Sequence, residues 1–327
     1  MDKYLQRYAE TGTAGVADMP VNESFSQVLV VPVCNEEIDI LRPLPPTPGR
    51  TLMILVVNEP ESSAPGVSLS NRRFADEVRA RFEWKWQSDL PKGLTLFTDP
   101  ASSRDVLLVD RFSDGLRFAG KGGVGHARKT GADLAAFLYH QHRVKLPWIH
   151  CSDADVVLPD RYFSAAGDFG REASRETAAL IYPFRHVEPM QGADDTVVRM
   201  SRLYEYSLRY YVAGLTYARS PYAFHTIGST MAVNAEHYAS VRGFPRREAG
   251  EDFYLLNKLA KVGSVHTLDE TTQCGPIEIM ARLSDRVPFG TGAAVGKMVG
   301  FRNPAEEFLL YHPAIFGLLK GWLDSLP

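Results

Sequence analysis

The chain has few cysteines and no long hydrophobic run, and both features exclude classes of protein. Its 327 residues contain only Cys34, Cys151 and Cys274, with no CxxC pair. This argues against a disulfide framework or a structural zinc and favours a reducing compartment. No stretch approaches the roughly 20 apolar residues that span a bilayer, and the N-terminus lacks the apolar core of a signal peptide. We therefore expect a cytoplasmic protein without a transmembrane segment.

The chain also lacks an excess of charge of one sign. Its net charge is −3 and its isoelectric point about 6.3, so no global positive field attracts nucleic acid. Hydrophobic residues make up 45% of the sequence, enough for a full core. Phe308 to Leu323 is rich in Leu, Phe, Tyr and Trp but interrupted by His312, Pro313 and Lys320. This predicts a C-terminal helix docked on the body, with peripheral membrane contact as the alternative.

Short apolar runs rich in β-branched residues alternate with helical patterns. The predicted strands are 28–33, 52–57, 105–110, 148–152, 178–182, 224–233 and 264–268, and the predicted helices are 71–86, 127–139, 198–217 and 251–261. This alternation predicts an α/β fold with a mixed, mostly parallel, doubly wound sheet flanked by helices. We expect an N-terminal surface appendage (1–26), one large domain (27–300, with halves 27–160 and 161–300) and a C-terminal helical segment (301–327).

Two carboxylates, Asp153 and Asp155, follow the predicted strand 148–152. The carboxyl ends of strands are where open α/β sheets bind ligands. A single Asp could cap a helix or form a turn, but two acids so close repel each other unless a cation holds them. The pattern therefore favours a divalent metal site.

A second acidic pair, Glu251 and Asp252, opens the predicted helix 251–261. Acids in a first helical turn complement the helix dipole, so a structural role is one interpretation. A catalytic role is the other, because the preceding run, Gly228 to Val233, contains small residues that let a ligand approach the backbone. On the next strand, His266 is either structural or a further metal ligand beside the Asp pair.

The segment Gly120 to Gly125 matches GxGxxG, the signature of a nicotinamide-dependent oxidoreductase. Nine residues separate it from the predicted strand end at Asp110, whereas that fingerprint needs its first glycine at a strand end. A phosphate-loop motif is also incomplete, because Gly122 stands where Ser or Thr would hold magnesium. What remains is a glycine-rich loop with Lys121 leading to a helix with Arg128, which favours an anion such as pyrophosphate.

Taken in order, four motifs resemble those of the GT-A glycosyltransferases of family 2. Val31 to Glu36 is similar to the first strand of that family (VIPxYNE), and Gly125 to Gly131 to its GxxxARNxG helix start. Asp153-Ala154-Asp155 is similar to its DxD motif, and Gly250-Glu251-Asp252 to its ED motif. The resemblance covers roughly residues 27–270. It implies a GT-A fold and a hexosyltransferase using a UDP- or GDP-linked sugar with Mg²⁺ or Mn²⁺.

The resemblance also implies roles for individual residues. Asp155 would coordinate the metal, with Asp153 on the ribose or a metal-bound water, and Asp252 would be the general base of an inverting transfer, with Glu251 beside it. The implied donor-binding residues are Pro32, Val33, Asn35 and Glu36 near the base, Asn58 at a pyrimidine edge, and Lys121 and Arg128 on the phosphates. Segment 281–292 is either a lid whose Arg282 or Arg286 clamps the diphosphate, or a surface turn.

The family's processive members carry a QxxRW sequence that this chain lacks, so we expect a soluble, non-processive transferase. Two alternatives remain open: a nicotinamide-dependent oxidoreductase using Gly120–Gly125, and a non-catalytic protein that binds a sugar nucleotide.

Overall fold

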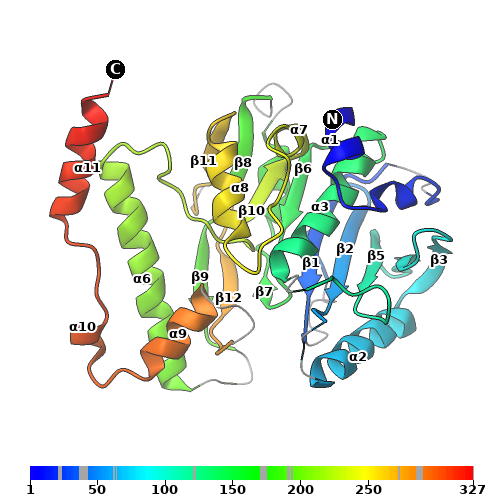
Figure 1. The fold of residues 1–327 in the computed structure, drawn as a ribbon, viewed down its shortest axis with the longest axis horizontal. Helices are drawn as coiled ribbons and strands as arrows, with labels where there is room; N and C mark the ends of the chain where they lie inside the picture. Colours follow the sequence, from blue (N-terminus) through cyan, green and yellow to red (C-terminus); the bar gives the residue numbers. More distant parts are fainter. Residues whose placement is uncertain are drawn as a thin grey trace.

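The computed structural model describes residues 1–20, 24–36, 43–61, 63, 65–120, 123–169, 175–189, 192, 194–271, 273–284 and 290–326. Within these residues the largest sheet has nine strands, in the order β11-β8-β10-β6-β1-β2-β5-β4-β3. Only β4 and β10 run against the others. A smaller sheet has the order β7-β12-β9. The predicted mixed, mostly parallel sheet is confirmed (Figure 1).

Strands and helices are interspersed along the chain, but the predicted alternation is not strict, because β3, β4 and β5 follow one another with no helix between them. The strands are β1 (Gln27–Val33), β2 (Thr51–Asn58), β3 (Glu83–Gln87), β4 (Leu94–Thr98), β5 (Arg104–Arg111), β6 (Trp148–Cys151), β7 (Val156–Val157), β8 (Thr177–Ile181), β9 (Phe184–Val187), β10 (Met231–Asn234), β11 (Ser264–Thr267) and β12 (Ile277–Met280). The helices are α1 (Asp2–Arg7), the 3-10 turn η1 (Thr13–Val16), α2 (Pro65–Arg81), α3 (Val124–His140), α4 (Tyr162–Gly167), α6 (Asp195–Tyr217), α7 (Ala235–Ser240), α8 (Glu251–Leu259), α9 (Thr291–Val299), α10 (Pro304–Glu307) and α11 (Ala314–Asp324).

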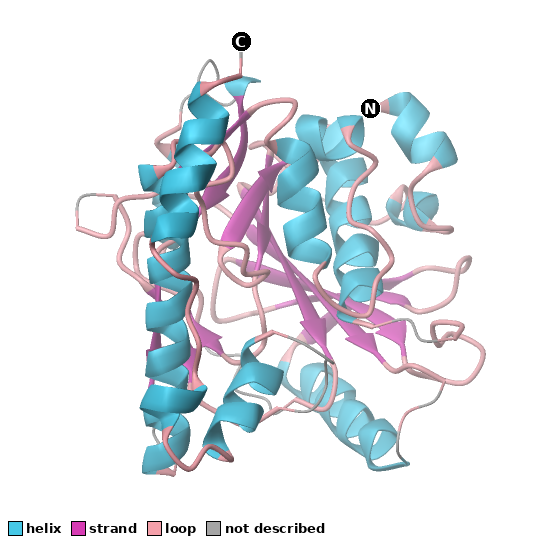
Figure 2. Cartoon of the chain, turned by 60° about the vertical axis from the view of Figure 1, so that its left-hand side comes forward, coloured by secondary structure: helices cyan, strands magenta, loops and turns pink. Residues whose placement is uncertain are grey.

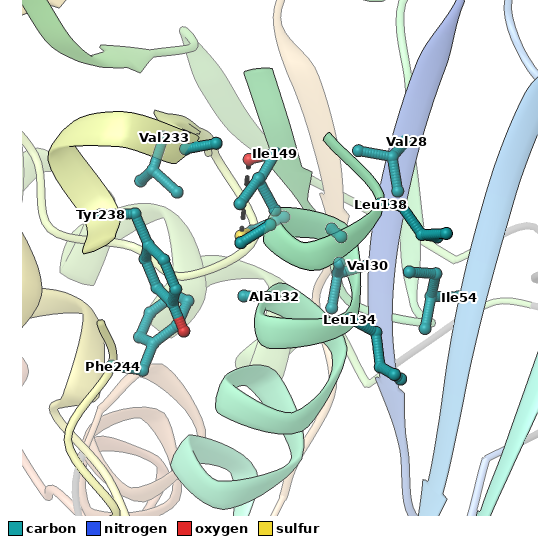
Figure 3. Close-up of a cluster of buried hydrophobic side chains, with 14 of the residues drawn as sticks. Val28, Val30, Ile54, Ala132, Leu134, Leu138, Ile149, Val233, Tyr238 and Phe244 are labelled. Atoms are coloured by element: carbon teal, nitrogen blue, oxygen red, sulfur yellow. Dashed lines mark hydrogen bonds between the residues drawn. The ribbon is translucent and has the colours of Figure 1, made fainter. Parts of the chain in front are cut away.

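The central strands are buried on both faces, which explains their continuous apolar sequences. Val28 and Val30 of β1 point to a core beneath α3, whereas Leu29 and Val31 point to a second core beneath α2 and α4. Figure 3 shows Leu134 and Leu138 of α3 beside β1 and β2. Helices therefore cover both faces of one sheet, as Figure 2 shows from the side.

A glycine sets how closely α3 approaches the sheet. A Cβ atom on Gly131 would lie 2.4 Å from Cγ1 of Val30, so any larger residue would push the helix away from β1. The close approach fixes the start of α3 at the edge of the sheet where β1, β2 and β6 end.

Some predicted boundaries are wrong. The helix predicted over 71–86 ends at Arg81, and residues 83–87 form the edge strand β3, which pairs with the unpredicted strand β4. In the run 224–233 only residues from Met231 onward form a strand, and 226–230 lead into it without strand pairing. Strand pairing of an exposed segment depends on a distant partner, which local periodicity does not reveal.

The first 26 residues, predicted as an appendage, contribute to the main core. Tyr4, Val16, Met19 and Phe25 are buried there. At the other end, α11 packs on α6 through Phe316, whose ring would lie 2.4 Å from a Cβ atom on Gly214. The division of the chain into an appendage, a two-part domain and a C-terminal segment stays a prediction.

Candidate active site

A cleft of about 680 Å³ opens where β1, β2 and β6 end. Its volume lies within the roughly 300–1,000 Å³ of small-molecule sites. Residues after these strands line one part of it, and the starts of α3 and α8, part of α6 and residues near Arg282 line the rest. Both acidic pairs predicted from the sequence lie in this cleft.

Arg128 of α3 joins the two acidic pairs. Its guanidinium donates to the carboxylates of Asp153 and Glu251, and its side chain is only 5% exposed. Burial alone would lower the pKa of Arg128, but the two carboxylates raise it, so the side chain stays charged. The space for this arrangement comes from Gly228, since a Cβ atom there would lie 2.0 Å from Nη1 of Arg128.

This geometry changes the expectation for Arg128. Both arms of the guanidinium already bind carboxylates, so its first role is to hold Asp153 beside Glu251. We expect Arg128→Met to lower the free energy of unfolding by about 3–5 kcal/mol, because removing the guanidinium leaves the buried charge of Glu251 uncompensated. Chemical denaturation measures this. Arg79→Ala, which removes an exposed ion pair with Asp76, is the control and should cost no more than about 0.5 kcal/mol. An equally small loss for Arg128→Met would contradict the buried bridge.

Asp155 lies in a second bridge. Nε of Arg282 donates to its carboxylate at 2.7 Å, and Nη2 of Arg282 donates to Glu36 at 2.9 Å. Burial raises the pKa of Asp155, Arg282 lowers it, and the neighbouring Asp153 raises it again. Arg282 thus ties the end of β12 to the ends of β1 and β6.

The pair Asp153 and Asp155 offers hard oxygen ligands of the kind that Mg²⁺ and Mn²⁺ bind. Burial is the largest cause of the raised pKa of Asp155 and repulsion from Asp153 adds to it, so a bound cation would favour the ionised form of both carboxylates. Among the described residues there is no group of three His, Cys, Asp or Glu side chains able to hold a metal. A cation held by these two carboxylates would need its remaining ligands from water or a bound diphosphate, the usual arrangement for Mg²⁺.

Asp252 stands in the first turn of α8 with its carboxylate in the cleft. Burial, together with the adjacent carboxylate of Glu251, raises its pKa to about 6, although Arg128 opposes the shift. A carboxylate with a raised pKa is a better proton acceptor while still ionised at neutral pH. Asp252 thus has the properties of a general base.

Glu10, in the segment after α1, connects the start of α3 with the loop before α8. Its carboxylate accepts hydrogen bonds from Nε of Arg246 at 2.6 Å and contacts Nε2 of His126 at 3.1 Å. Its backbone N–H donates to the buried Asp133 of α3, which also accepts from Tyr4. The N-terminal segment therefore fixes α3, which carries Arg128, and the loop that leads to Asp252 at the start of α8.

We expect Glu10→Gln to destabilise the protein at neutral pH. Burial alone would raise the pKa of Glu10, but the hydrogen bonds from His126 and Arg246 outweigh it and lower the pKa to about 2, below the unfolded value of 4.5. The stabilisation is therefore complete above pH 4.5 and is lost as the pH falls towards 2. Thermal unfolding should show a difference between variant and wild type that shrinks over this range.

Asp2→Asn is the control for Glu10→Gln, since Asp2 is an exposed acid paired with His140. It should leave the melting temperature nearly unchanged at every pH. If the melting temperatures of Glu10→Gln and the wild type differed by the same amount at every pH, the negative charge of Glu10 would not be what stabilises the protein.

Most of the predicted site residues lie in the cleft. These are Pro32, Glu36, Asn58, Arg128, Asp153, Asp155, Glu251 and Asp252. Asn58 is held by donating from Nδ2 to the carbonyl of Val33 at 3.0 Å. Val33 is instead buried in the core, and Asn35 is an exposed residue with φ 53° that does not line the cleft. Lys121 and Arg286 lie outside the described residues.

His266 is not brought to the Asp pair. It lies on the edge strand β11, three strands from β6, roughly 14 Å at the usual strand spacing. Its ring packs against Phe169 at 4.9 Å between centroids. Of the two interpretations of His266, this ring contact favours the structural one over a metal ligand.

Two glycines of the 120–125 segment, Gly123 and Gly125, have a packing role. A Cβ atom on Gly125 would lie 2.6 Å from the carbonyl oxygen of Arg247, and one on Gly123 would lie 3.2 Å from that of Glu248. The loop before α8 therefore lies against the start of α3, in part of the space where a dinucleotide fingerprint would bind a pyrophosphate.

Several residues of the cleft are not among the individually predicted site residues. Arg247 lines it with its guanidinium 3.9 Å from the centre of the Tyr254 ring. Tyr204 and Ser229 also line it. The run of tyrosines in α6 and the small residues 228–230 were visible signals, but neither shows which face points to the cleft.

No protein-family model matches the chain, and no curated protein matches its sequence. A solved structure of the mannosyltransferase PcManGT from Pyrobaculum calidifontis, in complex with GDP-Man and Mn²⁺, aligns over 99% of this chain and 88% of that chain. The TM-score is 0.42 and the sequence identity 14%. In the described part of the chain, no helix has the length and apolarity needed to cross a membrane.

Proposed function

We propose that this protein is a glycosyltransferase that moves a hexosyl group from a nucleotide-diphosphate sugar to an acceptor hydroxyl. The observation that carries the proposal is the meeting of Asp153 and Asp155 with Glu251 and Asp252 in one cleft, joined by Arg128. About 100 residues separate the two pairs in the sequence. The cleft therefore contains one pair of carboxylates for binding a cation, Asp153 and Asp155, and a second pair, Glu251 and Asp252, for accepting a proton.

The proposed reaction is an inverting displacement. Asp252 takes the proton of the acceptor hydroxyl, whose oxygen forms a bond to the anomeric carbon as the bond from that carbon to the diphosphate oxygen breaks. Asp153 and Asp155 would hold Mg²⁺ or Mn²⁺, which would neutralise charge on the departing diphosphate. Arg282, whose guanidinium contacts Asp155, would also bind a phosphate oxygen of the donor.

The experiment that tests the proposal is a calorimetric titration with UDP, GDP and NADH, each with and without Mn²⁺, followed by assays of transfer and donor hydrolysis. Binding of one nucleoside diphosphate that depends on Mn²⁺, together with turnover of its sugar derivative, is the expected result. Tight binding of NADH alone would favour an oxidoreductase. Donor binding without transfer or hydrolysis would leave a non-catalytic sugar-nucleotide-binding protein.

A further inference from the structure

A second, smaller cavity of about 90 Å³ lies beside the cleft, between α6 and α8. Its lining is mostly hydrocarbon and includes Leu208, Tyr211, Val212, Leu215, Phe224 and Phe253. None of its lining residues carries a charge at neutral pH, because burial lowers the pKa of its one histidine, His225, to about 4. The cavity therefore suits an apolar group.

The cavity and the cleft share a wall. Leu208, Thr226 and Phe253 line both, and Phe253 directly follows Asp252. A molecule with a hydroxyl at Asp252 can therefore extend a second part of itself into the cavity. The proposed donor does not need this space, since its diphosphate is assigned to Asp153 and Asp155, which do not line the cavity.

Exposed apolar side chains continue from the cavity over the surface. Tyr211, which lines the cavity, is 43% exposed, and its ring lies 5.5 Å from that of Tyr311, which is 60% exposed. On α11, beside α6 in Figure 1, Leu318 is 76% and Trp322 60% exposed. The Tyr211 ring adjoins both the cavity and the Tyr311 ring, and exposed apolar side chains that adjoin one another mark a place where an apolar partner binds.

We propose that the cavity and the ring of Tyr211 bind the hydrocarbon chain of an amphipathic acceptor, whose hydroxyl lies at Asp252. This inference rests on the proposed function, because it assigns the acceptor of that reaction. The cavity is smaller than an apolar cavity of about 150 Å³ that binds benzene. It therefore takes only a few carbon atoms, and the rest of an alkyl or isoprenyl chain lies over Tyr211 towards α11.

The test measures binding of n-alkyl β-glucosides (butyl, hexyl and octyl) below micelle-forming concentrations, by calorimetry without donor. Each methylene that becomes buried should tighten binding about fourfold. Val212→Trp, which fills the cavity from a half-buried position, should weaken octyl glucoside at least tenfold while nucleoside-diphosphate binding is unchanged. Tyr211→Ala, a change at an exposed position, gives the same test if the Trp variant does not fold.

The matched control is Leu318→Gln, which removes an exposed apolar side chain of α11 outside the cavity. It should leave the affinity for butyl glucoside unchanged. The inference would be overturned if the affinity for alkyl glucosides did not depend on chain length. It would also be overturned if Val212→Trp, Tyr211→Ala and Leu318→Gln lost equal amounts of that affinity. If the protein binds the nucleotide but its affinity for alkyl glucosides does not depend on alkyl chain length, only this inference is wrong. Cavity-dependent alkyl binding without any nucleotide binding defeats the proposed function instead.

Discussion

Asp252→Asn is expected to lower the rate of sugar transfer by about 10²–10⁴-fold, the usual contribution of a positioned general base. Asn keeps the shape of the side chain but cannot accept the acceptor proton. Donor and Mn²⁺ affinities should stay close to those of the wild type, because the cation is assigned to Asp153 and Asp155. Steady-state kinetics and calorimetry measure the two quantities separately.

Asp195→Asn is the matched control, since Asp195 is an exposed acid in the first turn of α6 and lies outside the cleft. Both variants remove a favourable contact with a helix dipole, but only Asp252→Asn should lose rate. Transfer by Asp252→Asn at close to the wild-type rate would show that the residue only complements the dipole of α8. Loss of donor binding would instead place Asp252 in the metal site.

The pH dependence of kcat/KM provides an independent test of whether Asp252 is the general base. Because the pKa of Asp252 is raised to about 6, the base is protonated below that pH and ionised above it. We therefore expect kcat/KM to rise with pH through about pH 6 in the wild type and to lose this step in Asp252→Asn.

Asp155→Asn is expected to abolish the Mn²⁺-dependent part of nucleoside-diphosphate binding. The loss should exceed the roughly 10–100-fold caused by changing a residue that only supports a metal ligand. The fold should be kept, because Arg282 retains its contact with Glu36 and a neutral amide relieves the repulsion from Asp153. Calorimetry with UDP and GDP, with and without Mn²⁺, measures the effect.

Asp76→Asn, at an exposed helical acid away from the cleft, controls for a change of net charge. Arg282→Gln separates the two bridges: it should weaken diphosphate binding more than nucleoside binding while leaving a response to Mn²⁺. Retained Mn²⁺-dependent affinity in Asp155→Asn would exclude Asp155 as a metal ligand.

The sequence alone predicts the layered α/β fold because its strands are long apolar runs and its helices have clear amphipathic patterns. In β1 and β2 every residue is buried, so the local sequence and the tertiary environment agree. The sequence also places Asp153 and Asp155 after β6 and Asp252 at a helix start, since both positions depend on element ends that local patterns locate well.

Other features of the site depend on contacts between distant residues. Nothing near Arg128 in the sequence indicates that it bridges Asp153 and Glu251, and Glu10 meets His126 and Arg246 only in the folded chain. Similarly, β3 is a strand because β4 lies beside it. The type of a buried apolar strand follows from neighbours in sequence, so the sequence determined the central strands such as β1 and β2 and the positions of the acidic pairs. Charge pairing and cavity shape follow from neighbours in space, so only the tertiary structure decided which residues face the cleft.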